Sequence, residues 1–244
     1  MLVVALGIIW LPGEAWATCT PAAPVNNADV TCTGTTTEQN APNGYGTNTD
    51  TRNAITVAPG ASVTGTGSGI VFDTGTVTNS GTISGGNGIF ANTTATITNF
   101  GTITGAGLEA IGAITANVTN FGTVTGAFNG IGATTANVTN FGTITGVGFH
   151  GISAVGTANV TNSGTIMGAN SGIGADTANV KNSGAISGGN FGIGANTTAT
   201  VVNSGTITGT GIDGIFSANA ASVTNSGTIS GAFNGIDAIT TGRD

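Results

Sequence analysis

The chain has 244 residues, 44 of them glycine, and carries 3 Lys and Arg against 10 Asp and Glu, a formal net charge of −7. Nucleic-acid binding needs clustered basic side chains to neutralise phosphates, and three cations cannot supply such a patch. Glycine does not recur at every third position, which excludes a collagen helix, and Leu108 is the only leucine after residue 17, which excludes a leucine-rich repeat.

The chain opens with an apolar stretch from Met1 to Trp10, followed by the small-x-small pattern Ala15-Trp16-Ala17. The stretch is too short to span a membrane and is typical of a secretory signal segment. We expect residues 1–17 to be a signal peptide cleaved after Ala17. Because no Lys or Arg precedes the apolar run, the sequence leaves open that the signal begins further upstream.

The segment 18–54 is rich in Thr, Asn and Pro and contains the two cysteines, Cys19 and Cys32. Two close cysteines in an exported chain favour a single disulfide. A redox or metal-binding pair is the less favoured alternative, since neither His nor a further Cys lies nearby. We predict that the segment caps the repeats that follow, with regular coiling beginning near Ile55 and Pro59-Gly60 replacing the Asn of later copies.

From residue 55 onward a motif of about 21 residues repeats, and its most regular position is an asparagine. Self-similarity at this period indicates a solenoid. Each copy alternates isolated branched residues with Thr, Ala, Asn or Gly, which predicts short strands with one buried face. We predict that Gly122, Gly126 and Gly130 separate three strands per rung, because glycine accepts the positive φ of tight corners. The resulting fold is all-β, with about nine rungs of 20–22 residues over 55–244.

Three columns of Val and Ile are predicted to line a narrow core, with a column of mostly small residues beside the third. The first contains Val57, Val77, Ile97, Val118, Val138, Val160, Val180, Val201 and Val223. The second contains Val63, Ile83, Ile103, Val124, Ile144, Ile166, Ile186, Ile207 and Ile229. The third contains Ile70, Ile89, Ile111, Ile131, Ile152, Ile173, Ile193, Ile215 and Ile236.

The repeated asparagines are predicted to stack inward at a corner, each amide bonding the next. This Asn ladder comprises Asn79, Asn99, Asn120, Asn140, Asn162, Asn182, Asn203 and Asn225.

Phe100, Phe121 and Phe141 follow the Asn on three successive rungs, where other copies carry Ser. Exposed stacked aromatics suit sugar rings or a partner surface, although the rings could simply pack on one another. Leu108, Phe128 and Phe149 align on the same rungs at another corner, and Phe128 and Phe149 join the candidate binding residues. Outward Thr-x-Thr rows resemble the ice-binding faces of some β-solenoids, but polar strand faces are commonly Thr-rich. These rows are Thr102/Thr104, Thr123/Thr125, Thr143/Thr145 and Thr206/Thr208.

No two titratable side chains are predicted to lie close enough together for catalysis. Asp213 and Asp237 both sit in Gly-Ile-Asp but occupy different columns. Glu109 and His150 share a column two rungs apart, about 10 Å, which is too far for direct proton transfer. Asn129 lies between them. We therefore predict no catalytic residues, no metal site and no cofactor.

The repeats stop in mid-rung at Thr240–Asp244, with no capping segment after them. A bare solenoid edge promotes aggregation, so we expect the chain to be part of something longer.

The signal segment, the close Cys pair, the opening ITVAPGASVTGTG and the repeats NSGTISG and NFGTITG together resemble autotransporter passenger domains of Gram-negative bacteria. The resemblance covers about residues 55–239. It implies a right-handed parallel β-helix, export through the inner membrane, and delivery to the cell surface by an outer-membrane β-barrel expected downstream. No catalytic residues carry over.

We therefore expect a non-enzymatic cell-surface β-helix that acts as an adhesin or a structural stalk, with glycans or surface proteins of a host or the environment as partners. A divergent polysaccharide lyase or hydrolase is the alternative, and an ice-binding solenoid is a remote one.

Overall fold

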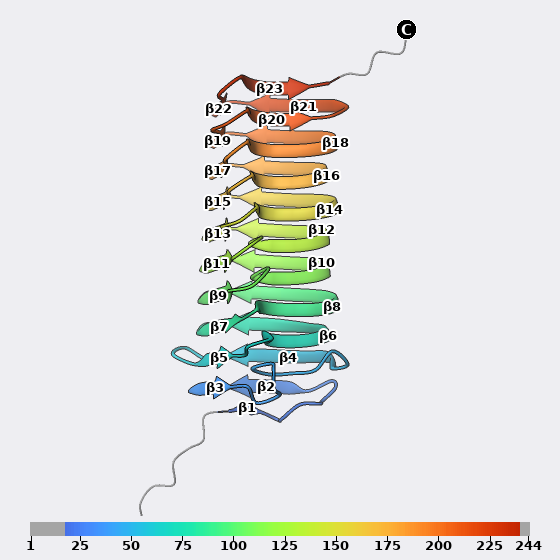
Figure 1. The fold of residues 1–244 in the computed structure, drawn as a ribbon, viewed down its shortest axis with the longest axis vertical. Helices are drawn as coiled ribbons and strands as arrows, with labels where there is room; N and C mark the ends of the chain where they lie inside the picture. Colours follow the sequence, from blue (N-terminus) through green and yellow to red (C-terminus); the bar gives the residue numbers. More distant parts are fainter. Residues whose placement is uncertain (1–17, 240–244) are drawn as a thin grey trace, which may run out of the picture.

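The computed structural model describes residues 18–239 as a β-solenoid in which the chain winds through about ten rungs stacked along one axis (Figure 1). Within these residues there is no helix, and hence none long and apolar enough to cross a membrane. The predicted parallel β-helix architecture is thus confirmed. The expected signal peptide and the last residues, 240–244, lie outside the described range.

Sheet A has 13 strands and contains the long strands of each rung. Its members are β1 (Cys19–Thr20), β2 (Asp29–Cys32), β4 (Thr51–Val57), β6 (Ser68–Asn79), β8 (Asn87–Asn99), β10 (Ile111–Asn120), β12 (Ile131–Asn140), β14 (His150–Asn162), β16 (Ser171–Asn182), β18 (Phe191–Asn203), β20 (Asp213–Ser217), β21 (Ala220–Asn225) and β23 (Asn234–Ala238). β1 pairs antiparallel with β2, and the later strands pair parallel, each with its equivalent one rung on.

Sheet B has ten short strands, one per rung. Its members are β3 (Thr35–Thr37), β5 (Ser62–Thr64), β7 (Thr82–Gly85), β9 (Thr102–Gly105), β11 (Thr123–Gly126), β13 (Thr143–Gly146), β15 (Thr165–Gly168), β17 (Ala185–Gly188), β19 (Thr206–Gly209) and β22 (Thr228–Gly231). All of them pair parallel and in register.

Each rung contains three extended segments, but the corners are not all made by glycine. Two of the segments are joined in one long strand, which bends where the pairing register shifts, as between Ala133 and Thr135. Gly126 and Gly130 flank a single corner. The expectation of positive φ at these glycines is wrong, since the described glycines with positive φ are Gly34, Gly46 and Gly60. The repeat glycines are needed for a different reason, which is close approach between rungs.

The three predicted columns form the core. Twenty-four of the 27 residues are buried. The other three, Val223, Ile229 and Ile236, lie in the last described rung and are partly exposed. Equivalent residues are direct neighbours in the sheets, as Val118 and Val138 are. Branched side chains therefore stack from rung to rung, and each rung covers the apolar surface of the next.

The predicted alignment fails at the first rungs. Val77 pairs with Ile55, while Val57 pairs with Asn79, so Val57 belongs to the column of the Asn ladder and not to the first aliphatic column. Pro59-Gly60 consequently lies in the corner that follows and not at the Asn position. Parallel pairing also begins before Ile55, because β2 already pairs with β4 and β3 with β5. The segment 18–54 therefore contributes a rung of its own.

A further buried column consists of alanines that the sequence patterns did not single out. Its members lie two residues before the first aliphatic column, and all are at most 1% exposed: Ala95, Ala116, Ala136, Ala158, Ala178 and Ala199. They follow the bend of the long strand, and in the first rungs the same column holds Asn53 and Gly75.

Candidate functional site

The two cysteines form a disulfide that joins β1 to β2 at the N-terminal end of the solenoid. Both are buried. Tyr45 is fully buried close to the segment after Cys19, and its hydroxyl donates to the carbonyl of Pro21 at 2.8 Å. Burial, followed by the charge of Asp50, raises the pKa of Tyr45 to about 12. Both thiols at this end of the molecule are thus held in the disulfide.

The asparagines of the predicted ladder stack inside the corner between sheets A and B. Each side-chain Nδ2 donates to Oδ1 of the next Asn at 2.7–2.8 Å, from Asn79 through to Asn225. The same nitrogen also reaches two backbone carbonyls, for Asn140 those of Gly142 and Thr165. The first seven asparagines are at most 3% exposed. Their amides satisfy the turn backbone that the corner would otherwise leave unpaired.

Outside this corner, Phe100, Phe121 and Phe141 form a stack of parallel rings. Their centroids are 5.0 and 4.9 Å apart, with interplanar angles of 5° and 6°. The side chains remain 47–55% exposed. The structure therefore brings the three predicted residues together on the surface, and their packing on one another leaves ring area open to solvent.

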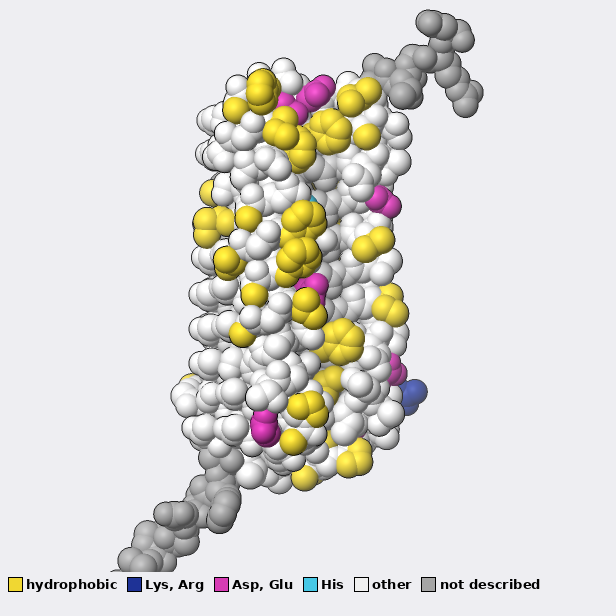
Figure 2. Space-filling view, viewed as in Figure 1, with side chains coloured by type: hydrophobic (Ala, Val, Ile, Leu, Met, Phe, Trp, Pro, Cys, Tyr) yellow, Lys and Arg dark blue, Asp and Glu magenta, His cyan; other side chains and the backbone are white. Residues whose placement is uncertain are grey.

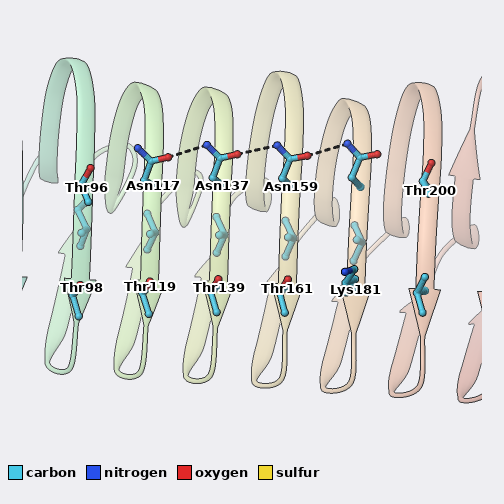
Figure 3. A pocket seen from close by; sticks show the side chains of 17 residues that line it. Thr96, Thr98, Asn117, Thr119, Asn137, Thr139, Asn159, Thr161, Lys181 and Thr200 are labelled. Carbon is cyan, nitrogen blue, oxygen red and sulfur yellow. Dashed lines mark hydrogen bonds between the residues drawn. The ribbon is translucent and has the colours of Figure 1, made fainter.

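A second Asn ladder, which the sequence analysis missed, runs along the outer surface of sheet A (Figure 3). Nδ2 of Asn137 donates to Oδ1 of Asn117, Asn159 to Asn137, and Asn179 to Asn159, at 2.8–2.9 Å. The donors point towards the N-terminal end, opposite to the inner ladder. The signal was present in the sequence, since these asparagines precede the inner ladder by three residues.

Beside this ladder lies a row of threonines that ends at Lys181 (Figure 3). Its members are Thr98, Thr119, Thr139 and Thr161. The two rows enclose a shallow groove of about 460 Å³. Since Phe100, Phe121 and Phe141 follow the Thr row by two residues, the amides, hydroxyls and rings occupy one side of the solenoid, which we call the outer face.

The second predicted aromatic set lies at the corner after sheet B. Phe128 and Phe149 stack with centroids 5.1 Å apart and an interplanar angle of 11°. Leu108 continues the row and is exposed, and backbone hydrogen bonds join the three residues from rung to rung. His150 packs against Phe149, with ring centroids 3.8 Å apart.

Glu109 and His150 do not form a dyad, because Asn129 separates them. Nδ2 of Asn129 donates to Oε1 of Glu109 at 3.4 Å, while its Oδ1 accepts the backbone N–H of His150 at 3.1 Å. Burial lowers the pKa of His150, partly opposed by a backbone hydrogen bond with Ser171. Nδ1 of the ring is buried with no hydrogen-bond partner among residues 18–239. The amide contacts the Glu109 carboxylate but not the His150 ring, so it offers no relay between them.

The two aspartates also lie apart. Asp213 is 2% exposed and pairs with Asn234, whereas Asp237 pairs with Phe216. Oδ1 of Asp213 accepts both the backbone N–H of Asn234, at 3.1 Å, and its Nδ2, at 3.0 Å. Asp213 thus has the same structural role as Asn129, whose side chain likewise accepts the N–H of the next rung.

The Thr-x-Thr rows lie along β9, β11, β13 and β19 in sheet B. Met167 pairs with Thr145 of the preceding rung, and Ala185 pairs with Thr165. The row of hydroxyls is therefore interrupted in the middle of the sheet. Within residues 18–239, no group of three or more His, Cys, Asp or Glu side chains could hold a metal ion.

Comparison of the chain with protein-family models, curated proteins and solved structures finds no match. The fold and its exposed ladders define the chain as a β-solenoid repeat protein. The finer resemblance to autotransporter passengers remains an interpretation of the sequence.

Proposed function

We propose that this chain is a non-enzymatic binding or structural solenoid of the cell surface, an adhesin or stalk that holds partners on its outer face. The observation that carries the proposal is the parallel stack of Phe100, Phe121 and Phe141, which keeps half of each side chain exposed. Exposed contiguous aromatic surface marks interaction sites. The apolar faces of sugar rings or a protein surface can cover it.

The neighbouring rows supply the polar contacts that such a partner needs. Amides of the outer Asn ladder and hydroxyls of the Thr row both donate and accept hydrogen bonds. They repeat with the rung spacing of about 4.8 Å. A rigid array of this kind is pre-organised, so a partner immobilises few side chains when it binds.

Glycan-array binding by the full chain tests this function, with Phe121→Ala as the variant. Removing the middle ring breaks both stacking contacts, and we expect affinity to fall about tenfold. Phe233→Ala is the matched control, because Phe233 is 77% exposed and stands outside the ladder. If the wild type binds no glycan, or if both variants lose affinity equally, the Phe stack is not a binding site and the protein would act only as a spacer.

The proposal includes export to the surface of a Gram-negative bacterium. It is supported by the apolar N-terminal segment in the sequence and by the Cys19–Cys32 disulfide, a bond typical of oxidising compartments. Mass spectrometry of the mature chain and protease treatment of intact cells test it. We expect an N-terminus at Thr18 and loss of the protein from treated cells.

The alternative from another class is a polysaccharide-cleaving enzyme, and it is favoured only by the carboxylate of Glu109 in a hollow of the surface. Product release from polysaccharides that disappears in Glu109→Gln or Asp213→Asn would support it. Our proposal predicts no cleavage by any of these proteins.

A further inference from the structure

A trough runs along the solenoid on the outside of the segment that precedes the bend of each long strand. Its floor consists of small residues that are direct neighbours in sheet A: Gly112, Gly132, Ser153, Gly174 and Gly194. Phe90 borders the floor at one end and Phe216 at the other. From Phe90 to Phe216 the trough spans six rung steps, about 29 Å. Figure 2 shows a lengthwise hollow with hydrophobic side chains along its rim.

The glycines leave room for larger side chains that fold over the floor. A Cβ at Gly132 would lie 2.7 Å from Cγ of Glu109, and one at Gly174 would lie 2.7 Å from Cε1 of His150. The side chains of Glu109 and His150 therefore lie over these glycines and form part of the trough lining.

Two hollows of about 400 and 440 Å³ occupy the trough and meet at Ser153 and Val155. The first contains Phe90 and Glu109. The second contains Phe149, His150, Phe191 and Asp176. Amides of Asn92, Asn129, Asn170 and Asn196 complete the lining. Each hollow thus combines at least one aromatic ring with side-chain amides and one carboxylate.

The charge of the lining is one-sided. Among the described residues that line the two hollows there is no Lys or Arg, whereas Glu109 and Asp176 bring one carboxylate to each. They lie three rungs apart, about 14 Å. The chain as a whole carries a net charge of −7. Such a trough repels anionic polymers and attracts cationic ones.

We propose that the trough binds a linear amino-bearing polysaccharide, which lies along the solenoid axis with its sugar rings on the Phe side chains and its ammonium groups near Glu109 and Asp176. This site is separate from the outer face and does not depend on the function proposed for it.

The geometry favours a polysaccharide over an extended basic peptide. An extended peptide gains affinity by adding to an exposed strand edge, and the backbone of the trough floor is already paired on both sides within sheet A. A peptide lying in the trough would leave most of its backbone to water. A sugar chain needs only apolar contact on ring faces and scattered hydrogen bonds, which the Phe and Asn side chains can supply.

Isothermal titration of the full chain with oligomers of β-linked glucosamine tests the proposal. The N-acetylated oligomer, oligogalacturonate and an extended Lys-Gly peptide of equal charge serve as comparison probes. We expect binding of the glucosamine oligomer that weakens with added salt. Ser153→Phe should abolish it by filling the junction of the hollows, whereas Ser153→Ala should bind like the wild type. Glu109→Gln with Asp176→Asn should weaken it about tenfold.

Phe121→Ala should leave trough binding unchanged, so this result and the test of the outer face are independent. Thermal melting shows whether each variant is folded. If Ser153→Phe does not fold, the double variant Glu109→Gln, Asp176→Asn still tests the proposal, because it keeps the acceptor oxygens. The proposal is overturned if the glucosamine oligomer does not bind, if the N-acetylated or anionic oligomer binds equally well, or if the double variant binds like the wild type. Tighter binding of the peptide would assign the trough to a basic protein segment instead.

Discussion

Two asparagines of a single rung, Asn137 and Asn140, have amides with different surroundings. Asn140 is fully buried, and its Nδ2 donates to Asn162 and to two carbonyls. Asn137 lies on the outer face and bonds only its ladder neighbours. Buried polar groups that lose a partner cannot turn to water, whereas exposed ones can.

We therefore expect Asn140→Ala to lower the free energy of unfolding by about 1–3 kcal/mol, and Asn137→Ala by less than about 1 kcal/mol. Urea denaturation of the two variants beside the wild type measures both values. Equal losses would mean that the inner ladder is no more important to the fold than the outer one.

His150 makes stability depend on pH. Because burial lowers its pKa in the folded state, the unfolded chain, with a His pKa of about 6.5, binds more protons in the window below that value. Stability is therefore full above about pH 7 and falls as the pH drops through 6.5 towards the lower folded pKa. Asp176 lines the same surface hollow as His150, and this carboxylate is present in both the wild type and a His150 variant.

We expect the stability of the wild type relative to His150→Gln to fall on acidification from about pH 7.5 to 5, because only the wild type gains the extra proton on unfolding. Denaturation midpoints of both proteins across this range give the difference. Parallel curves would show that the imidazole is as accessible when folded as when unfolded.

At the scale of the strand, the corner after the inner Asn depends on a glycine because neighbouring rungs approach closely there. A Cβ at Gly122 would lie 2.8 Å from the carbonyl carbon of Phe100 and would collide with the carbonyl of Gly101. We expect Gly122→Ala to cost about 1–3 kcal/mol, since the backbone must shift to relieve overpacking. At the other corner the nearest atom to a Cβ on Gly107 is 3.3 Å away. Gly107→Ala should therefore melt much closer to the wild type.

The strand pattern could be predicted because Val and Ile occupy the core positions with few exceptions. The bend of the long strand could not, since its position carries Ile114, Thr134, Val155 or Asp176 and has no common chemistry. The first rungs were misaligned because Val57 looks like a member of the aliphatic column, while its actual place is that of Asn79. The buried alanine column could not be predicted, because Ala is common both on surfaces and in cores.

At the scale of the whole molecule, each surface is formed by residues of several rungs, and the register between rungs decides which residues become neighbours. The sequence reveals this register only in part. The Phe stack was visible because three rings recur with the period. The trough was not, because its glycines differ little from those at corners and its lining comes from several rungs. The trough lies before the bend of the long strands and the outer face after it, so the molecule can present two surfaces at once.

The central claim is that equivalent residues of successive copies lie one rung apart along a single axis. Electron–electron distance measurements between spin labels on paired cysteines test it most directly, with one label at Thr78 and the other at Thr161, Lys181 or Val202. These positions share one outward row, four, five and six rungs from Thr78. We predict narrow distributions that lengthen by about 4.8 Å per rung, near 19, 24 and 29 Å. Broad distributions, or distances that do not grow with the number of intervening copies, would contradict the solenoid and both binding surfaces built on it.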